Sequence, residues 1–386
     1  MIWFQDDPAP RVREVSAEQL RSLIVANPTA TVLKTLLGDA LMRDRDFAGA
    51  AAAFASAARD DPTRFERWTS LVRGYRKSLQ LDAALDALRR ADRVDPSAAL
   101  TVERGRVLRL MGQVPAAEAA FRAALSDSSD SGTRWSAFDG LLRLLALDDD
   151  GARLLAACDE AQKEIGDVAL VRAHRALAYS RMGKTDAARH MIDVDRHVLR
   201  LPVAAPDGYA DIGAFNAALS EEILRVGASP GDVSLRYMPD LGRQPVLATL
   251  LNIIRTTLES YVAKRAERGL ADVLPPPPAS AKLFYGNTVL RNRGVNGVHI
   301  HGDGYVSAVY HVSVPGSITA AADHRGALAL GVVGKCAPNH VPCWGIRYVR
   351  PVSGWLTLFP SHFFHDVVPS GEALPRISVA ADLLPR

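Results

Sequence analysis

The chain has 386 residues, of which 48% are hydrophobic and 23% are charged, a composition typical of soluble proteins with two or three domains. The formal net charge of +3 is small for this length and no block of Lys and Arg stands out, which argues against nucleic acid as a partner. Apolar runs stay below about 18 residues, so we expect no membrane partner.

The N-terminal stretch MIWFQDDPAPRVREV has no basic segment followed by an apolar run, so we expect no secretory signal. The three cysteines are Cys158, Cys336 and Cys343. This odd and sparse set suits a reducing compartment better than a disulfide framework. We therefore expect a cytoplasmic location.

The first half of the chain repeats with a period of 34 residues, as between Pro62 and Pro96. The aligned positions are Leu37, Gly38, Leu41, Ala50, Phe54, Ala57 and Pro62 in one unit and Leu71, Val72, Tyr75, Ala84, Leu88, Ala91 and Pro96 in the next. Small residues at these positions allow helices to cross closely, and a proline ends each second helix because it cannot continue one.

This pattern resembles the tetratricopeptide repeat, a pair of antiparallel helices. A third unit is shifted by one residue, and weaker units cover 134–162 and 168–193, so about five units fall within 15–195. Stacked units of this kind bury a continuous core and display a concave surface for peptides or partner proteins. We predict an N-terminal α-solenoid of helical hairpins over 15–195.

The pattern changes after residue 195. Amphipathic helices are predicted over 211–227 and 244–269, within a helical lead-in at 196–280 that includes the proline run 275–278. Short runs rich in β-branched and aromatic residues then predict strands at 282–292, 305–315, 326–334, 354–360 and 376–384. The predicted class is a multidomain α plus β protein with a β-sandwich or barrel over 281–386.

Two histidines and a carboxylate lie within five residues, at His299, His301 and Asp303. In an extended strand these side chains share one face. A distal partner is expected at His365, with His362 as its competitor. Two imidazoles, a carboxylate and open positions form the facial triad of non-haem Fe(II) oxygenases.

A carboxylate-binding pair is predicted further along the chain, at Arg376 and Ser378. These two residues share a face in a strand, where a guanidinium fork and a hydroxyl would bind one carboxylate. Such a pair just after the distal histidine would suit a 2-oxo acid that chelates the metal. We expect these two residues to bind the co-substrate.

The ordered motifs HIH, SAVYHV, GWLTLFPS, HDVVP and RIS resemble a bacterial and phage group of Fe(II)/2-oxoglutarate-dependent dioxygenases, over roughly 205–386. The chain departs from the group's pattern at Ala308 and His311. The resemblance implies a double-stranded β-helix (jelly-roll) with Fe(II) at its open end, 2-oxoglutarate as co-substrate and O2 as oxidant, with ascorbate supporting activity. It implies no catalytic side chain beyond the metal ligands.

Two ligand sets are compatible with the sequence. A literal His-x-Asp motif gives His301, Asp303 and His365, which we prefer because a carboxylate offsets the charge of Fe(II). The register of the resembling group gives His299, His301 and His365 instead, with Asp303 left as a turn residue. Both sets share His301 and His365.

Three functions follow as hypotheses. The first is a hydroxylase of peptide or protein side chains that the repeats recruit. The second is an oxygenase on a small metabolite whose repeats serve assembly, and the third is a repeat scaffold with an inactive barrel. The intact histidine and Arg-x-Ser set argues against the third. The sequence leaves homo-oligomerisation open.

Overall fold

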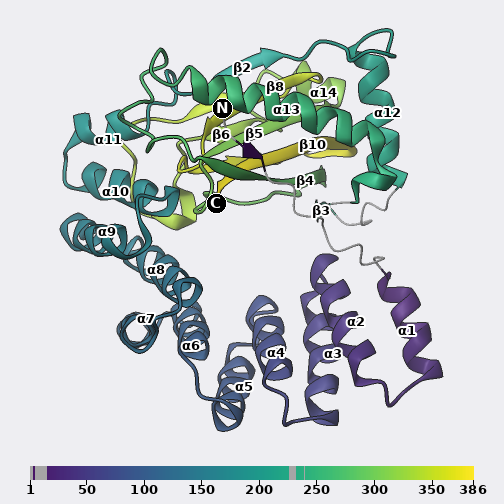
Figure 1. Cartoon of the computed structure of the whole chain (residues 1–386), viewed down its shortest axis with the longest axis vertical. Coiled ribbons are helices and arrows are strands. Elements are labelled where there is room, and N and C mark those ends of the chain that lie inside the picture. Colours follow the sequence, from purple (N-terminus) through teal and green to yellow (C-terminus); the bar gives the residue numbers. More distant parts are fainter. Residues whose placement is uncertain (1–2, 5–14, 226–231, 239) are drawn as a thin grey trace. The chain divides into compact units, whose positions relative to one another are not determined.

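The computed structural model describes residues 3–4, 15–225, 232–238 and 240–386 (Figure 1). The chain divides into two compact units, 12–144 and a second formed by 145–386 with the N-terminal residues 1–11. The described residues confirm the predicted class, because helices fill the first unit and antiparallel sheets with flanking helices fill the second. No helix among the described residues combines the length and the apolar character needed to span a membrane.

The first unit is built from helices that follow one another as antiparallel pairs. They are α1 (Ala17–Ala26), α2 (Thr31–Arg43), α3 (Phe47–Asp60), α4 (Phe65–Lys77), α5 (Leu81–Val94), α6 (Ala98–Leu110), α7 (Val114–Asp127) and α8 (Ser131–Leu145), the last of which ends at the unit boundary. The pairs α2–α3, α4–α5 and α6–α7 correspond to the repeats that the sequence predicts.

Glycines in these hairpins lie against aromatic rings of the paired helix. A Cβ added to Gly38 would lie 2.3 Å from Phe54 Cε1, and one added to Gly105 would lie 2.7 Å from Phe121 Cε1. Both distances are too short for non-bonded carbons, so only glycine fits these crossings. The repeat pattern therefore reflects close packing between helices.

Three further helices belong to the second unit. They are α9 (Gly151–Ile165), α10 (Ala169–Arg181) and α11 (Thr185–Met191). The sequence assigns this segment to the repeats because its small-residue pattern continues to about residue 193. The structure places it in the same compact unit as the sheets, with the border between the two units at 144/145.

The second unit contains a seven-stranded sheet with the order β1-β4-β10-β5-β8-β2, and β3 also pairs with β4. The strands are β1 (Trp3–Phe4), β2 (Leu199–Pro202), β3 (Val233–Tyr237), β4 (Ser280–Asn292), β5 (Val306–Ser313), β8 (Trp355–Pro360) and β10 (Glu372–Pro385). All pairs are antiparallel except β1 with β4. The central strand β10 therefore carries the C-terminal end of the chain into the middle of the sheet.

A second, three-stranded antiparallel sheet has the order β7-β6-β9. Its strands are β6 (Leu328–Leu330), β7 (Arg347–Val349) and β9 (His365–Val367). The ring of Phe359 on β8 meets the ring of His365 on β9 at 5.0 Å between centroids. One face of the large sheet thus meets the small sheet through these two rings.

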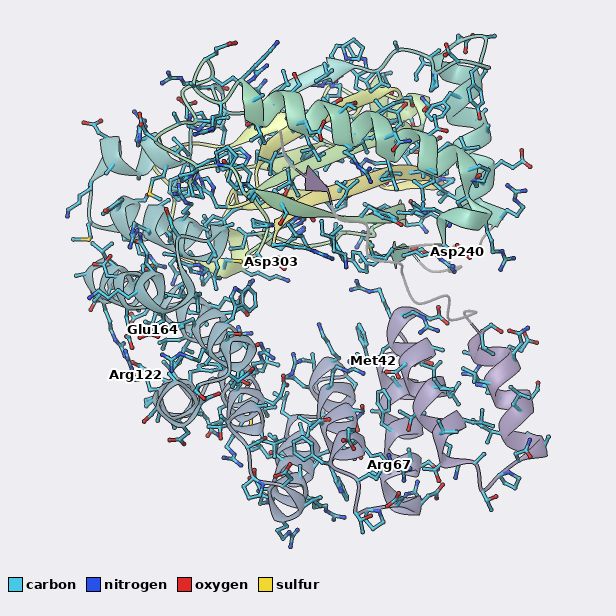
Figure 2. All side chains as sticks on the ribbon, in the orientation of Figure 1. Met42, Arg67, Arg122, Glu164, Asp240 and Asp303 are labelled. Atoms are coloured by element: carbon cyan, nitrogen blue, oxygen red, sulfur yellow. The ribbon has the colours of Figure 1, made fainter. Side chains whose placement is uncertain are left out.

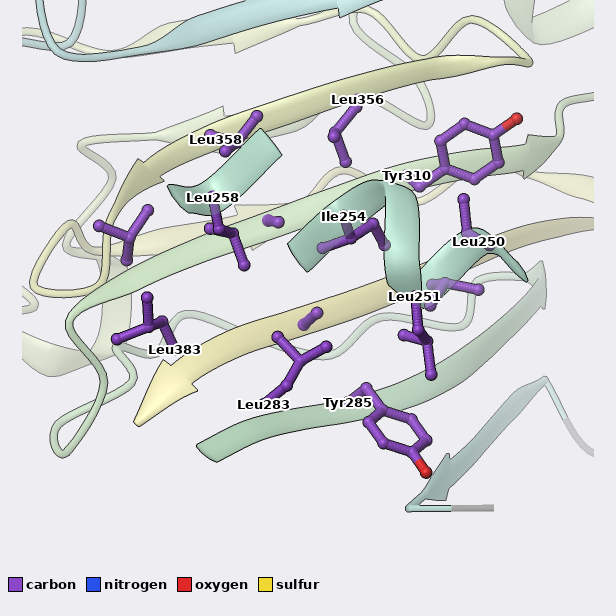
Figure 3. Close-up of a cluster of buried hydrophobic side chains, with 14 of the residues drawn as sticks. Leu250, Leu251, Ile254, Leu258, Leu283, Tyr285, Tyr310, Leu356, Leu358 and Leu383 are labelled. Carbon is purple, nitrogen blue, oxygen red and sulfur yellow. The ribbon is translucent and has the colours of Figure 1, made fainter. Parts of the chain in front are cut away.

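Helices α12 (Ile212–Arg225) and α13 (Pro245–Ala263) cover the other face of the large sheet. Figure 3 shows Leu250, Ile254 and Leu258 of α13 directed at strand residues that include Leu358 and Leu383. The carboxylate of Glu222 on α12 accepts the backbone N–H of Val246 and Leu247 at the start of α13, at 3.1 and 2.8 Å. This contact satisfies two of the amides that a helix start leaves unpaired.

The remaining elements are short. They are η1 (Leu241–Arg243), α14 (Gly316–Thr319) and η2 (Gly334–Cys336). The predicted helices at 211–227 and 244–269 correspond to α12 and α13 over the described residues. The five predicted strands correspond to β4, β5, β6, β8 and β10, whereas β1, β2, β3, β7 and β9 are additional, with β2 and β3 lying in the predicted helical lead-in.

Candidate active site

Strand β10 separates polar from apolar side chains by simple alternation. Ile377, Val379 and Leu383 are buried in the core under α12 and α13. Arg376 and Asp382 occupy the alternate positions and therefore face the opposite side of the sheet. Both are buried, with 1% and 6% of their surface exposed. This alternation places a set of buried polar groups on the face that meets the small sheet.

Three histidines converge beside this face. The ligand atoms of His299, His301 and His365 all lie within 4.8 Å of one another. Backbone hydrogen bonds fix the segments: His299 and His365 exchange N–H to O=C bonds of 3.0 Å, and the N–H of His301 donates to the carbonyl of Ser361 at 3.1 Å. The site is therefore built by pairing the segment around residue 300 with the segment around residue 363.

Each of the three imidazoles has its Nδ1 in a hydrogen bond. His299 Nδ1 lies 2.7 Å from the carbonyl oxygen of Gly297, and His365 Nδ1 lies 2.9 Å from that of Phe363, so both Nδ1 atoms donate. His301 Nδ1 bonds to the carboxylate of Asp382. These bonds fix the tautomer that leaves Nε2 with its lone pair, which is the form that binds a metal.

Asp382 belongs to a small network that holds His301. Ser307 Oγ donates to Asp382 Oδ1 at 2.6 Å and lies 2.9 Å from Ser361 Oγ. Burial lowers the pKa of His301, but the charge of Asp382 and its hydrogen bond raise that pKa above the ordinary value. A carboxylate in this position orients a histidine ligand and increases its basicity.

Asp303 does not join the histidines. The N–H of Gly304 donates to the carbonyl of His301 at 3.0 Å, which closes a turn over 301–304. The expectation that Asp303 shares a face with His301 requires an extended strand, and this turn removes that condition. The Asp303 side chain is exposed at the surface of its unit (Figure 2).

His362 also lies outside the cluster. Its Nε2 bonds to the carbonyl oxygen of Met191 at 2.8 Å. Burial lowers the pKa of His362 to about 3, so it is neutral and Nε2 carries the proton. This histidine supports the contact between α11 and the loop that precedes β9.

Arg376 is a buried cation without an ion pair among the described residues. Its Nε and Nη1 have no hydrogen-bond partner, and its Nη2 lies 3.4 Å from Nδ1 of His311. Burial lowers the pKa of Arg376 to about 10. A buried guanidinium usually has an anionic partner, so this one is suited to an anionic ligand.

His311 and Thr357 add further polar atoms on the same face. Residues 311 and 378 face each other across β5 and β10, so His311 lies beside Ser378, which is also buried. Burial and the charges of Arg376 and Arg200 hold the pKa of His311 well below its usual range. His311 Nδ1 then accepts from Arg376, and its Nε2–H has no partner among the described residues, nor does Thr357 Oγ1.

Helices α10 and α11 contact the segments that carry the histidines. The N–H of Leu170 donates to the carbonyl of Gly302 at 2.9 Å, directly after His301. The ring of His174 packs edge-on against Phe364, next to His365, with 6.1 Å between centroids. Nearly all of α10 is buried. This helical hairpin therefore supports the loops that carry His301 and His365.

Sequence reasoning missed Asp382, Ser307 and Thr357 and gave His311 no role. The one available signal was the two-residue alternation Arg376, Ser378, Asp382 along a single predicted strand. The pairing of Asp382 with His301 spans 81 residues of sequence. It results from the order of strands in the sheet, which local patterns do not reveal.

The comparison with protein families points to the same region. A family model described as "Putative 2OG-Fe(II) oxygenase" matches residues 287–382. This range contains the three histidines, Arg376 and Asp382. The match supports an oxygenase domain in the C-terminal part of the chain.

Solved structures with similarity to the chain include a peptide-binding repeat protein, a second repeat protein and a hydroxylase. YrrB, a TPR protein with an unusual peptide-binding site, is 16% identical with a TM-score of 0.34, covering 45% of this chain and 92% of that one. TTC0263, a thermophilic TPR protein of Thermus thermophilus, is 21% identical with a TM-score of 0.35, covering 42% and 88%.

A Pseudomonas putida prolyl-4-hydroxylase is 16% identical with a TM-score of 0.34, covering 50% of this chain and 96% of that one. TM-scores this low carry no conclusion about function. No curated protein matches the chain.

Proposed function

We propose that the protein is an Fe(II)- and 2-oxoglutarate-dependent oxygenase that hydroxylates a peptide or protein side chain recruited by the helical repeats. The observation that carries the proposal is the combination of three imidazoles, each with Nδ1 already bonded, with a buried guanidinium that has no counter-ion among the described residues. The three imidazoles suit a metal ion, and the guanidinium suits a carboxylate.

His299, His301 and His365 would hold the iron through Nε2. Three imidazoles suit Fe(II), and the buried carboxylate of Asp382 supplies through His301 the negative charge that the sequence argument sought in Asp303. Iron with 2-oxoglutarate and O2 supplies the oxidising chemistry, and 2-oxoglutarate becomes succinate and CO2.

Arg376 would bind the carboxylate of 2-oxoglutarate remote from the metal. His311 accepts from one guanidinium nitrogen, which orients the fork, and its own Nε2–H has no partner among the described residues. Ser378 and Thr357 supply hydroxyl groups on this face. The burial of these groups excludes water and strengthens each charge-assisted bond.

The test compares two neighbouring histidines. His365→Ala should lose Co(II) binding, used as a spectroscopic stand-in for Fe(II), and should lose conversion of 2-oxoglutarate to succinate. His362→Ala is the matched control, because His362 is also buried but lies outside the cluster, and it should keep Co(II) binding. Wild-type Co(II) affinity in His365→Ala would refute the metal assignment.

Substrate class is tested separately from the metal. Peptide libraries and metabolite extracts are incubated with the enzyme, Fe(II), 2-oxoglutarate and ascorbate, and products are searched for the mass of one added oxygen. The proposal expects the gain in peptides. A gain confined to small metabolites would favour the oxygenase on a metabolite, and succinate formation in neither would favour the inactive scaffold.

A further inference from the structure

The helices of the 12–144 unit divide their charges unequally. Helix α4 carries four basic residues and one acidic residue, and α6 carries three basic residues and one acidic residue. The second helices of the hairpins differ: α5 carries three of each sign, and α7 carries two acidic residues and one basic residue. Because α2 contacts α4 and α4 contacts α6, these first helices lie side by side and concentrate positive charge on one face.

Ion pairs between these first helices engage two of their carboxylates. Asp39 on α2 pairs with Arg73 on α4 at 2.8 Å. Glu103 on α6 is shared between Arg76 of α4 at 2.9 Å and Arg106 of its own helix at 2.5 Å. These two carboxylates face three guanidinium groups, so they do not neutralise the positive charge of this face.

Lys77 and Arg109 have no ion pair among the described residues. Arg109 Nε is enclosed and lacks a hydrogen-bond partner. Burial lowers the pKa of Arg109, and the charge of Arg143 lowers it further. Burial also lowers the pKa of Lys77, and the charge of Arg76 adds to this effect. A bound anion would relieve this mutual repulsion.

We propose that the first-helix face centred on Arg76, Lys77, Arg106 and Arg109 binds an acidic segment of a protein partner. Contacting helices lie about 8–10 Å apart, which is close to the span of about three residues of extended chain. The ligand is therefore an extended peptide with a carboxylate at roughly every third residue. Glu103, which already pairs with Arg76 and Arg106, adds a negative charge to this face that disfavours a uniform polyanion.

The test measures binding to the full chain without iron, by fluorescence anisotropy. The probe is a fluorescein-labelled peptide with Glu at every third position in a Gly and Ser background, and its Gln analogue is the reference. The Glu peptide should bind at least about tenfold more tightly than the analogue. Raising NaCl from about 50 to 300 mM should weaken its binding about tenfold, because partly exposed ion pairs are screened.

Variants locate the site. Lys77→Gln with Arg109→Gln should weaken binding of the Glu peptide at least about tenfold. Lys77→Gln alone should give a measurable part of that loss without affecting folding. The matched control removes two exposed charges from α5, Arg89→Gln with Arg93→Gln, and should leave binding unchanged.

The proposal would be overturned if both double variants lost affinity for the Glu peptide equally. It would also be overturned if a single-stranded RNA oligonucleotide bound more tightly than the Glu peptide. The inference goes beyond the oxygenase activity and does not depend on it. His365→Ala should bind the peptide as the wild type does, which separates failure of this proposal from failure of the metal assignment.

Discussion

Replacing Arg376 by methionine should strengthen the fold and weaken co-substrate binding at the same time. The guanidinium is 1% exposed and has no counter-ion among the described residues, and burial lowers its pKa from 12.5 to about 10. At 1.36 kcal/mol per pKa unit, the buried charge costs up to about 3 kcal/mol. Methionine would fill the space of the aliphatic part of the arginine side chain without introducing that charge.

In the absence of metal and 2-oxoglutarate, the free energy of unfolding of Arg376→Met should therefore be about 1–3 kcal/mol higher than that of the wild type. This corresponds to a rise in Tm of roughly 3–8 °C for a unit of this size. Removing one partner of a buried charge pair costs about 2–5 kcal/mol, so the Kd for 2-oxoglutarate should rise about 30-fold or more. The stabilisation that 2-oxoglutarate gives the wild type should then be lost.

Thermal unfolding of the metal-free protein and calorimetric titration of 2-oxoglutarate into the Mn(II)-loaded protein measure the two effects. Arg376→Lys is the matched variant, because it keeps the buried charge but lacks the planar fork; it should show no gain in Tm and an intermediate loss of affinity. The reasoning is refuted if Arg376→Met lowers the Tm of the ligand-free protein or leaves the Kd for 2-oxoglutarate unchanged.

Three further predictions concern the histidines. Asp382→Asn should weaken Co(II) binding about 10- to 100-fold, because its bond to His301 loses the carboxylate charge; an unchanged absorption titration would contradict this. His299→Ala should abolish Co(II) binding and exposed Asp303→Ala should change it less than about threefold, and the reverse order would restore Asp303 as the ligand. Burial lowers the pKa of His197 to about 4 and that of His362 to about 3, so unfolding takes up protons below the ordinary value of 6.5. Stability should then fall as the pH drops from 7.5 to 5, by about 2 kcal/mol for each group, and urea unfolding of metal-free protein with equal midpoints at both pH values would contradict it.

The repeats were predictable because their information is local. A glycine facing Phe54 or Phe121 recurs with the hairpin, so the period of the sequence is the period of the structure. The C-terminal limit of the repeats was harder to predict from the sequence. The small-residue pattern continues through α10, but the burial of α10 within the sheet-containing unit depends on contacts with loops more than a hundred residues later.

The site was predictable in its residue types and less so in its geometry. The sequence pattern singled out the segments around His301 and His365, which the structure brings together with His299, and the turn at 301–304 leaves Asp303 outside this cluster. That turn is set by one backbone hydrogen bond between Gly304 and His301. Strand alternation is a rule for extended chain, so it fails where an extended segment ends.

The bond between Leu170 and Gly302 has a consequence for how this molecule can be modified. A cut or graft after residue 195 would leave the His301 loop without α10, whereas one near residue 145 would keep the whole of α10 and α11 with the loops they support. The hydrogen-exchange rate of the Leu170 backbone amide can also serve as a probe, because it reports whether the loop that carries His301 is held in place.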